Sequence, residues 1–119
     1  MAIGFRIFDR ERAVSADLVA KFARLPVATV SDSLHRMTAG GDRLRTMHRE
    51  GVLAGAALAV KARPGDTLML HKAIDMAQPG DVIAVDAGGE LTNSLMGELM
   101  LAHADPARRG GLCAERRDP

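Results

Sequence analysis

Two apolar runs joined by a helix-like segment constrain the fold of this chain more than any other feature. The runs VLAGAALAVKA at 52–62 and VIAVD at 82–86 have the composition of buried strands. Between them, TLMLHKAIDMA at 67–77 carries apolar residues at helical spacing, and Pro-Gly turns flank it in ARPGD at 62–66 and PGD at 79–81. Strands that alternate with helices predict a parallel or mixed sheet between helical layers, and therefore an α/β protein.

Further elements are expected before this unit. Residues 1–14 are expected to form an extended arm. Ser15 is a suitable N-cap for a first helix, which Pro26 would end, and a second helix is expected over VSDSLHRM at 30–37. Asp66 is expected to cap the helix that joins the two strands. The apolar faces of these helices are expected to be Leu18, Val19, Phe22 and Leu25 in the first, Val30, Leu34 and Met37 in the second, and Leu68, Ile74 and either Leu70 or Ala77 in the third.

Composition limits the classes of protein to which the chain can belong. Its 119 residues allow one domain, and 47% hydrophobic residues are enough for a core. The balance of 16 basic and 15 acidic residues gives no general attraction to nucleic acid or to a membrane surface. The longest apolar run is too short to span a bilayer, no signal peptide is visible, and the single cysteine, Cys113, suits a reducing cytosol. We therefore expect a cytoplasmic protein with no nucleic-acid or membrane partner.

A glycine pair after the second strand marks a candidate binding site. Gly88 and Gly89 allow positive φ angles and a close approach of the backbone to a ligand. The residues that follow indicate a loop entering a helix, and free N–H groups from Gly97 to Met100 would stabilise a carboxylate or phosphate. The alternative is a plain connection from strand to helix, with Thr92 or Asn93 as the N-cap. Nucleotide binding is not expected, because no GxGxxG or GxxxxGK[ST] motif is present.

Few side chains suggest chemistry by themselves. Glu98 could hold a metal-bound water or act as an acid or base, and the alternative is a partner of the helix dipole on a solvated face. Lys72 could form a Schiff base only if it were desolvated, and Lys21 and Lys61 lie on other elements. Asp86 ends a strand but is an isolated acid. None of the four histidines has the HExxH spacing of a zinc site: His35, His48, His71 and His103.

The motifs in this chain resemble one family over about residues 15–104. LPVATVSDSLHRM, then PGDTLMLHKAIDMAQPGDVIAVDAGG and GELM in this order, are similar to class II 4-hydroxy-4-methyl-2-oxoglutarate aldolases and to regulator-of-ribonuclease-activity-A-like proteins. Some members carry the older name demethylmenaquinone methyltransferase-like. The resemblance implies a three-layer α/β/α sandwich of the swivelling β/β/α type, incomplete here at the C-terminus. It also implies homotrimers or hexamers with active sites between subunits.

The same resemblance implies a reaction and a cofactor. The reaction is retro-aldol cleavage of 2-oxo-4-hydroxy dicarboxylates to pyruvate, with oxaloacetate decarboxylation in many members, and the cofactor is Mg²⁺ or Mn²⁺. The substrate carboxylate would bind the backbone N–H groups of Gly97, Glu98, Leu99 and Met100, while the metal would stabilise the enolate. Glu98 matches the first acidic residue of the family pattern, in which twenty residues separate it from an Arg-Asp pair. The alternative is a non-catalytic regulator that binds ribonuclease E.

The end of the chain departs from this family pattern. The spacing from Glu98 requires the family's arginine at 119, where Pro119 stands, and the pair Arg117-Asp118 comes two residues early. Its context, CAERRDP, is not an apolar strand end and glycine turn, so Asp118 is a metal-ligand candidate outside the expected position. We expect residues 1–104 to be the N-terminal part of a single domain. Residues 105–119 are expected to be a divergent tail, read out of frame or genuinely diverged.

Overall fold

A parallel sheet of three strands organises the chain. The computed structural model describes residues 5–38, 44–46, 49–89, 92–104 and 111–114. In the order β1-β2-β3, the strands are β1 (Ala56–Lys61), β2 (Asp81–Asp86) and β3 (Gly111–Ala114). The first two confirm the predicted strands, although β1 is shorter than the apolar run that contains it. The third was not predicted, because its four residues lie in the Arg- and Gly-rich segment after Ala104.

The register of the sheet aligns the ends of β1 and β2. Six residue pairs run from Ala56 opposite Asp81 to Lys61 opposite Asp86. β3 continues the parallel arrangement, from Val82 opposite Gly111 onward. Because both strands run in the same direction and end at the same pair, their carboxyl ends lie side by side at one edge of the sheet. The sheet of the α/β protein is thus parallel, as the alternation of strands and helices predicted.

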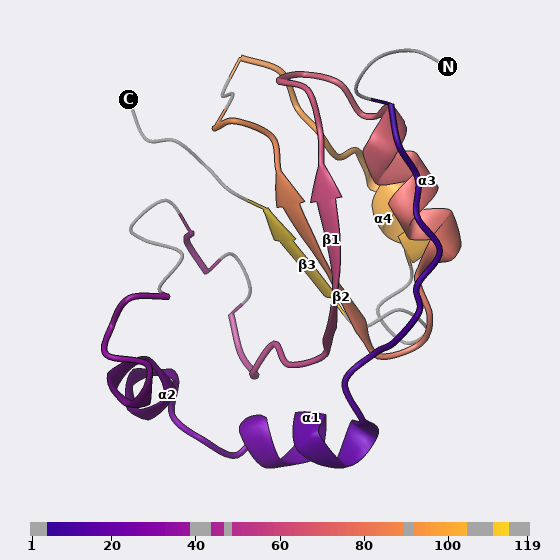
Figure 1. Cartoon of the computed structure of the whole chain (residues 1–119). Coiled ribbons are helices and arrows are strands. Elements are labelled where there is room, and N and C mark those ends of the chain that lie inside the picture. Colours follow the sequence, from indigo (N-terminus) through magenta and orange to yellow (C-terminus); the bar gives the residue numbers. More distant parts are fainter. Residues whose placement is uncertain (1–4, 39–43, 47–48, 90–91, 105–110, 115–119) are drawn as a thin grey trace.

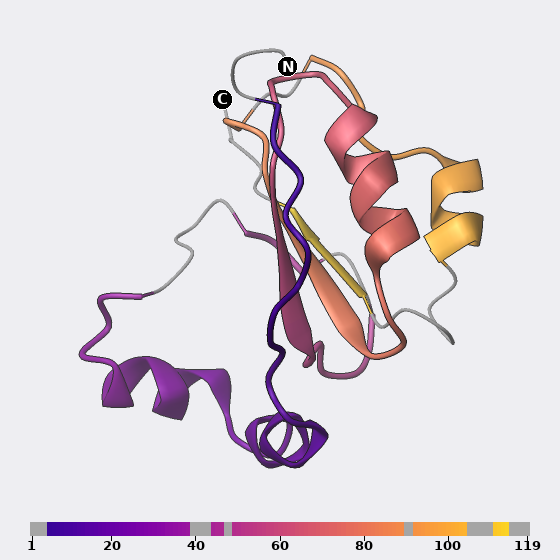
Figure 2. The same ribbon diagram turned by 45° about the vertical axis from the view of Figure 1, so that its right-hand side comes forward.

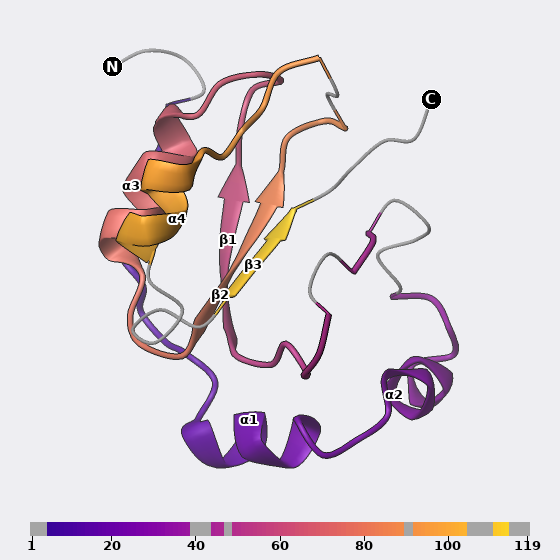
Figure 3. The ribbon, with the colours of Figure 1, turned by 180° about the vertical axis from the view of Figure 1, so that it is seen from behind.

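Two helices cover one face of the sheet. Helices α3 (Leu68–Met76) and α4 (Glu98–Ala104) lie next to each other on this face, as seen from the front and from behind (Figures 1 and 3). The buried core between helices and sheet consists of Ala62, Leu70, Ala73, Ile74, Ile83, Val85 and Ala87. On the opposite face, Ala57 and Ala59 of β1 are exposed. In Figure 2, α3 and α4 lie together to one side of the strands.

The prediction for the buried face of α3 is confirmed in part. Leu70 and Ile74 are almost fully buried, with Ala73 beside them, so positions separated by three and four residues face the sheet. Leu68 is 56% exposed, and its prediction as a core residue is wrong. It precedes Leu70 by only two residues, a spacing that places it on a different side of the helix.

Helices α1 (Ala16–Phe22) and α2 (Val27–Ser33) lie apart from the core (Figure 1). The Ser15 hydroxyl accepts a hydrogen bond from the Leu18 N–H at 3.3 Å, which confirms the predicted N-cap. α2 begins and ends earlier than predicted, because the residues after Leu34 leave the helical conformation. The predicted core faces of both helices are wrong: neither helix has a buried residue, and Leu18, Phe22, Leu25, Leu34 and Met37 are exposed.

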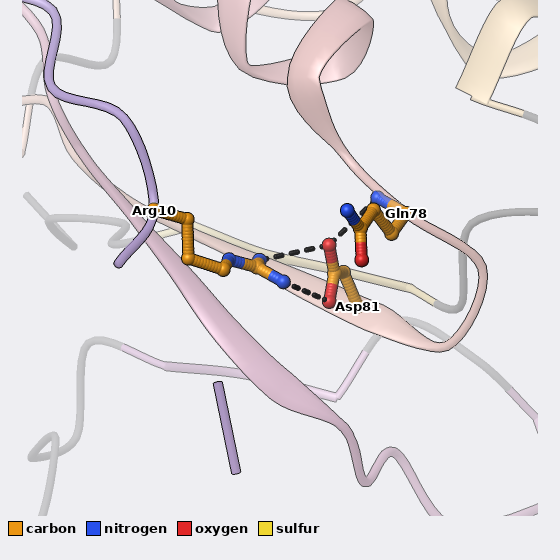
Figure 4. Close-up of polar contacts among 3 residues, drawn as sticks. All are labelled: Arg10, Gln78 and Asp81. Atoms are coloured by element: carbon orange, nitrogen blue, oxygen red, sulfur yellow. Dashed lines mark hydrogen bonds and ion pairs between the residues drawn. The ribbon is translucent and has the colours of Figure 1, made fainter. Parts of the chain in front are cut away.

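The N-terminal arm is attached to the start of β2 by an ion pair between a half-buried arginine and a buried carboxylate. The guanidinium of Arg10 donates two hydrogen bonds to the carboxylate of Asp81, at 2.9 and 2.8 Å, and the Gln78 N–H donates a third at 2.7 Å (Figure 4). Asp81 is only 3% exposed. A buried carboxylate needs such partners, since an unpaired charge in a low-dielectric environment is strongly unfavourable. The arm, extended as predicted over its described residues, passes beside β1 in Figure 2.

The charge of Asp81 depends on these partners. Burial alone would raise the pKa of this carboxyl, but the hydrogen bonds from Arg10 and Gln78 and the positive charge of Arg10 outweigh it, so the pKa is lowered. Asp81 therefore remains ionised, and the ion pair persists, throughout the neutral range.

Removing Arg10 should destabilise the fold. We expect Arg10→Met to lower the free energy of unfolding by about 3 kcal/mol, because it leaves the Asp81 carboxylate buried without its cation. Urea unfolding measures the change. Arg12→Met is the matched control, since Arg12 is an exposed arginine on the same arm. Equal stability of the two variants would contradict a structural role for the ion pair.

The stability gained from Asp81 should vanish in acid. The pKa of Asp81 in the folded state lies below its ordinary value of 3.8, so its contribution is complete above that value and is lost as the pH falls through the lowered folded pKa. The difference in unfolding free energy between wild type and Asp81→Asn should therefore be constant near neutrality and shrink below about pH 4. Denaturation curves across this range test it, and a difference independent of pH down to complete unfolding would refute it.

Candidate functional site

The carboxyl ends of β1 and β2 bring together the charged groups of the candidate site. The Lys61 ammonium donates to one carboxylate oxygen of Asp86, and the other oxygen accepts a hydrogen bond from the Gly88 N–H at 3.0 Å. The Ala62 N–H donates to the Asp86 carbonyl at 2.9 Å. Asp86 therefore connects the end of β1, the end of β2 and the glycine turn, and it is not the isolated acid that the sequence suggested.

A tight turn follows β1 at this edge. The Asp66 N–H donates to the Arg63 carbonyl at 3.0 Å, and Gly65 has a φ of +73° after Pro64, which is the geometry of a type II turn. The Asp66 carboxylate accepts a hydrogen bond from the Leu68 N–H at 2.9 Å, so it does bind the start of α3, but the N-cap is Thr67 and not Asp66 as predicted. The turn thus ends β1 and starts α3 within a few residues.

The loop after β2 packs on that turn. Gly88 and Gly89 have φ angles of +70° and +69°, which confirms the predicted left-handed conformation. A Cβ atom at Gly88 would lie 3.3 Å from Cγ of Pro64, and one at Gly65 would lie 2.9 Å from Nδ2 of Asn93. The two loops at the carboxyl edge therefore support each other, and glycine is required where they meet.

The predicted helix start is present at Gly97. The Leu101 N–H donates to the Gly97 carbonyl at 3.0 Å, so α4 starts as predicted and neither Thr92 nor Asn93 is its N-cap. A Cβ atom at Gly97 would meet no atom within 4 Å, and one at Gly88 would meet only Pro64. The glycine turn thus contacts the turn after β1, whereas the space beside Gly97 is open among the described residues.

The side chains around the α4 start are divided between solvent and core. Glu98 and Leu99 are exposed, and within the described part of the chain the Glu98 carboxylate makes no hydrogen bond or ion pair. Met100 packs against the core. His103 Nε2 lies 3.2 Å from Asp75 Oδ1, which links α4 to α3. Glu98 is therefore available to a ligand, but no described group orients its carboxylate.

The described residues do not form a metal site. Across the described ranges, no three side chains of His, Cys, Asp or Glu are close enough together to hold a metal ion. Glu98 is a single carboxylate, and Asp118 lies outside the described residues. In the same ranges, no helix has the length and apolar character needed to cross a membrane.

Lys61 is the main site residue that the sequence analysis missed. It was judged remote from the glycine motif because it belongs to another strand, but the register places it against Asp86. The signal was available in the sequence. The segments AVK and AVD each end in a charged residue, and a parallel pairing of the two strands can align these ends. Lys72, the lysine nearest to the motif in the sequence, is exposed on α3. Cys113, interpreted as incidental, lies in β3 opposite Ala84.

Comparison with known proteins gives two matches. The model of a family described as "RraA-like: Aldolase/RraA" matches residues 27–113, and so continues past Ala104 into β3. A protein of Halalkalibacterium halodurans named "Putative 4-hydroxy-4-methyl-2-oxoglutarate aldolase" is 32% identical over 88 residues, which are 74% of this chain and 42% of that protein. The chain thus spans less than half the length of this relative. No solved structure matches the chain.

Substituting Gly65 should disturb the loop after β2 more than substituting Gly80, its counterpart in the turn before β2. Both glycines follow a proline in a turn with positive φ, so alanine at either position should cost about 1 kcal/mol of backbone strain. Only Gly65→Ala also forces Asn93 to move, since a Cβ at Gly80 would meet nothing within 4 Å. Amide chemical shifts of residues 92–97 should change in Gly65→Ala and not in Gly80→Ala. Identical spectra would show that the loop does not rest on this turn.

Proposed function

The chain belongs to the RraA-like family, and we propose from this membership that its carboxyl edge binds a 2-oxo acid as part of an aldolase that releases pyruvate. The observation that carries the proposal is the glycine turn after β2, held by Asp86 and packed on the turn after β1. Ligand sites of parallel α/β sheets form at the carboxyl ends of the strands. The name of the Halalkalibacterium halodurans relative, with its 4-hydroxy-2-oxo acid substrate, supports this reading.

The chemistry of the substrate suits the groups at the start of α4. A 4-hydroxy-2-oxo acid carries a carboxylate next to its keto group, and retro-aldol cleavage breaks the C3–C4 bond after the 4-hydroxyl loses its proton. Backbone N–H groups at the start of α4, from Glu98 to Met100, precede the first intrahelical donor and suit a carboxylate. The exposed Glu98 carboxylate is our candidate for the acid or base that moves the proton.

Dependence on a divalent metal belongs to the proposal. Mg²⁺ or Mn²⁺ would supply the Lewis acid that an enolate requires. Since the described residues do not make a metal site, its ligands would come from elsewhere, with Asp118 among the candidates. We therefore assign no step of the reaction to the metal.

The larger architecture is also proposed. The exposed Ala57 and Ala59 lie on the face of the sheet opposite α3 and α4. In a three-layer α/β/α sandwich a second helical layer would cover such a face. We propose that residues 1–104 are the N-terminal part of this domain and that 105–119 form a divergent tail, of which the family match still covers the part up to residue 113. We also propose that the complete assembly is a cytoplasmic homotrimer or hexamer.

Pyruvate release tests the proposed activity. We expect pyruvate to form from 4-hydroxy-4-methyl-2-oxoglutarate in the presence of Mg²⁺ or Mn²⁺, and a chelator to abolish it. Glu98→Gln should lower kcat by about 100-fold, as expected for the loss of a general acid or base. Glu11→Gln, which alters an exposed carboxylate on the arm, is the matched control.

The other outcomes separate the alternatives. Borohydride with pyruvate should leave no adduct, since Lys72 and Lys61 are exposed and a Schiff base needs a desolvated lysine. Oxalate binding without pyruvate release would favour the non-catalytic regulator that binds ribonuclease E. Failure of both oxalate binding and pyruvate release would contradict the proposal.

A further inference from the structure

The N-terminal arm is an extended segment without a strand partner. Its residues 5–14 form neither helix nor strand, and within the described part of the chain none of their backbone groups is hydrogen-bonded to another backbone group. The arm passes beside β1, which is the edge strand of the sheet and pairs only with β2 among the described strands (Figure 2). Unpaired N–H and C=O groups along an extended segment are a template for pairing with another strand.

The side chains of the arm are those of a strand. Phe5, Ile7 and Phe8 belong to the residue types that favour strands, and all three are exposed, Phe8 to 75%. Three large apolar side chains within four residues form a patch rather than a single exposed residue. Arg10 attaches the arm to Asp81, so this patch is held at the surface of the molecule.

The charges of the arm complement those of a second copy. Arg6 and Asp9 flank the apolar pair Ile7 and Phe8, are exposed, and have no ion pair within the described residues. If two arms pair antiparallel about the midpoint between Ile7 and Phe8, Arg6 of each copy lies opposite Asp9 of the other, and Ile7 lies opposite Phe8. Opposite residues share one face of such a pair, so every one of these contacts is favourable.

We propose that the N-terminal arm is an association strand that pairs antiparallel with the arm of a second copy of this chain. The proposal is independent of the aldolase activity, because no residue of the carboxyl edge is part of the contact. Two-fold symmetry repeats each contact, and a short strand pair of this size gives a weak, reversible association. A two-fold contact cannot close a ring of three subunits, so it would be additional to the contacts of the proposed trimer.

Charge reversal on the two copies tests the pairing. Arg6→Asp places two aspartates opposite each other, and Asp9→Arg places two arginines opposite each other, so each variant should associate with itself about tenfold more weakly than wild type. An equimolar mixture of the two variants should associate as wild type does, because every Asp then faces an Arg. Arg12→Asp makes the same charge change beyond the paired residues and is the matched control. Sedimentation equilibrium up to about 1 mM protein measures all four samples and the wild type.

Hydrogen exchange locates the contact. Amides of residues 5–9 should exchange more slowly as the wild-type concentration rises, and this change should be absent in Arg6→Asp and restored in the mixture. If the reversals leave association unchanged, or the mixture does not recover it, association occurs through another surface, such as the exposed apolar faces of α1 and α2, and the proposal is wrong. Slow exchange of the arm that is independent of concentration would instead show pairing with β1 of the same chain, and would also overturn it.

Discussion

The parallel register between β1 and β2 determines what lies at each end of the molecule. It pairs Ala56 with Asp81 at one edge and Lys61 with Asp86 at the other. A shift of one residue would separate Lys61 from Asp86. It would also exchange the faces of one strand, and so move Ile83 and Val85 out of the core. The hydrophobic pattern that builds the core and the charge pattern that builds the candidate site therefore depend on the same register.

The two ends of this strand pair use charge in different ways. Asp81 is buried and bound by Arg10 and the Gln78 backbone, so its partners are needed for the carboxylate to remain ionised inside the protein. Asp86 is exposed, and its contacts with Lys61 and Gly88 position groups at a surface. The amino end of the sheet is thus a structural attachment for the N-terminal arm, while the carboxyl end retains charged groups that a ligand can reach.

Local patterns predicted the elements well and their packing less well. The Pro-Gly turns, the alternation of strand and helix, the Ser15 cap and the positive φ of Gly88 could all be predicted, because each depends on a few neighbouring residues. The core faces of α1 and α2 could not, since an apolar stripe does not reveal whether anything packs against it. Lys61 was missed for a related reason: its contact with Asp86 spans 25 residues and exists only through the register.

The central claim is that the carboxyl edge of the sheet holds the 2-oxo acid. Oxalate mimics the planar enolate of pyruvate, and hydrogen exchange of the backbone amides would locate it directly. With Mg²⁺ present, the account predicts slower exchange at Gly88 and Gly89 and from Gly97 to Met100, with the arm and α1 unchanged. Protection confined to other segments, or no protection at saturating oxalate, would contradict it.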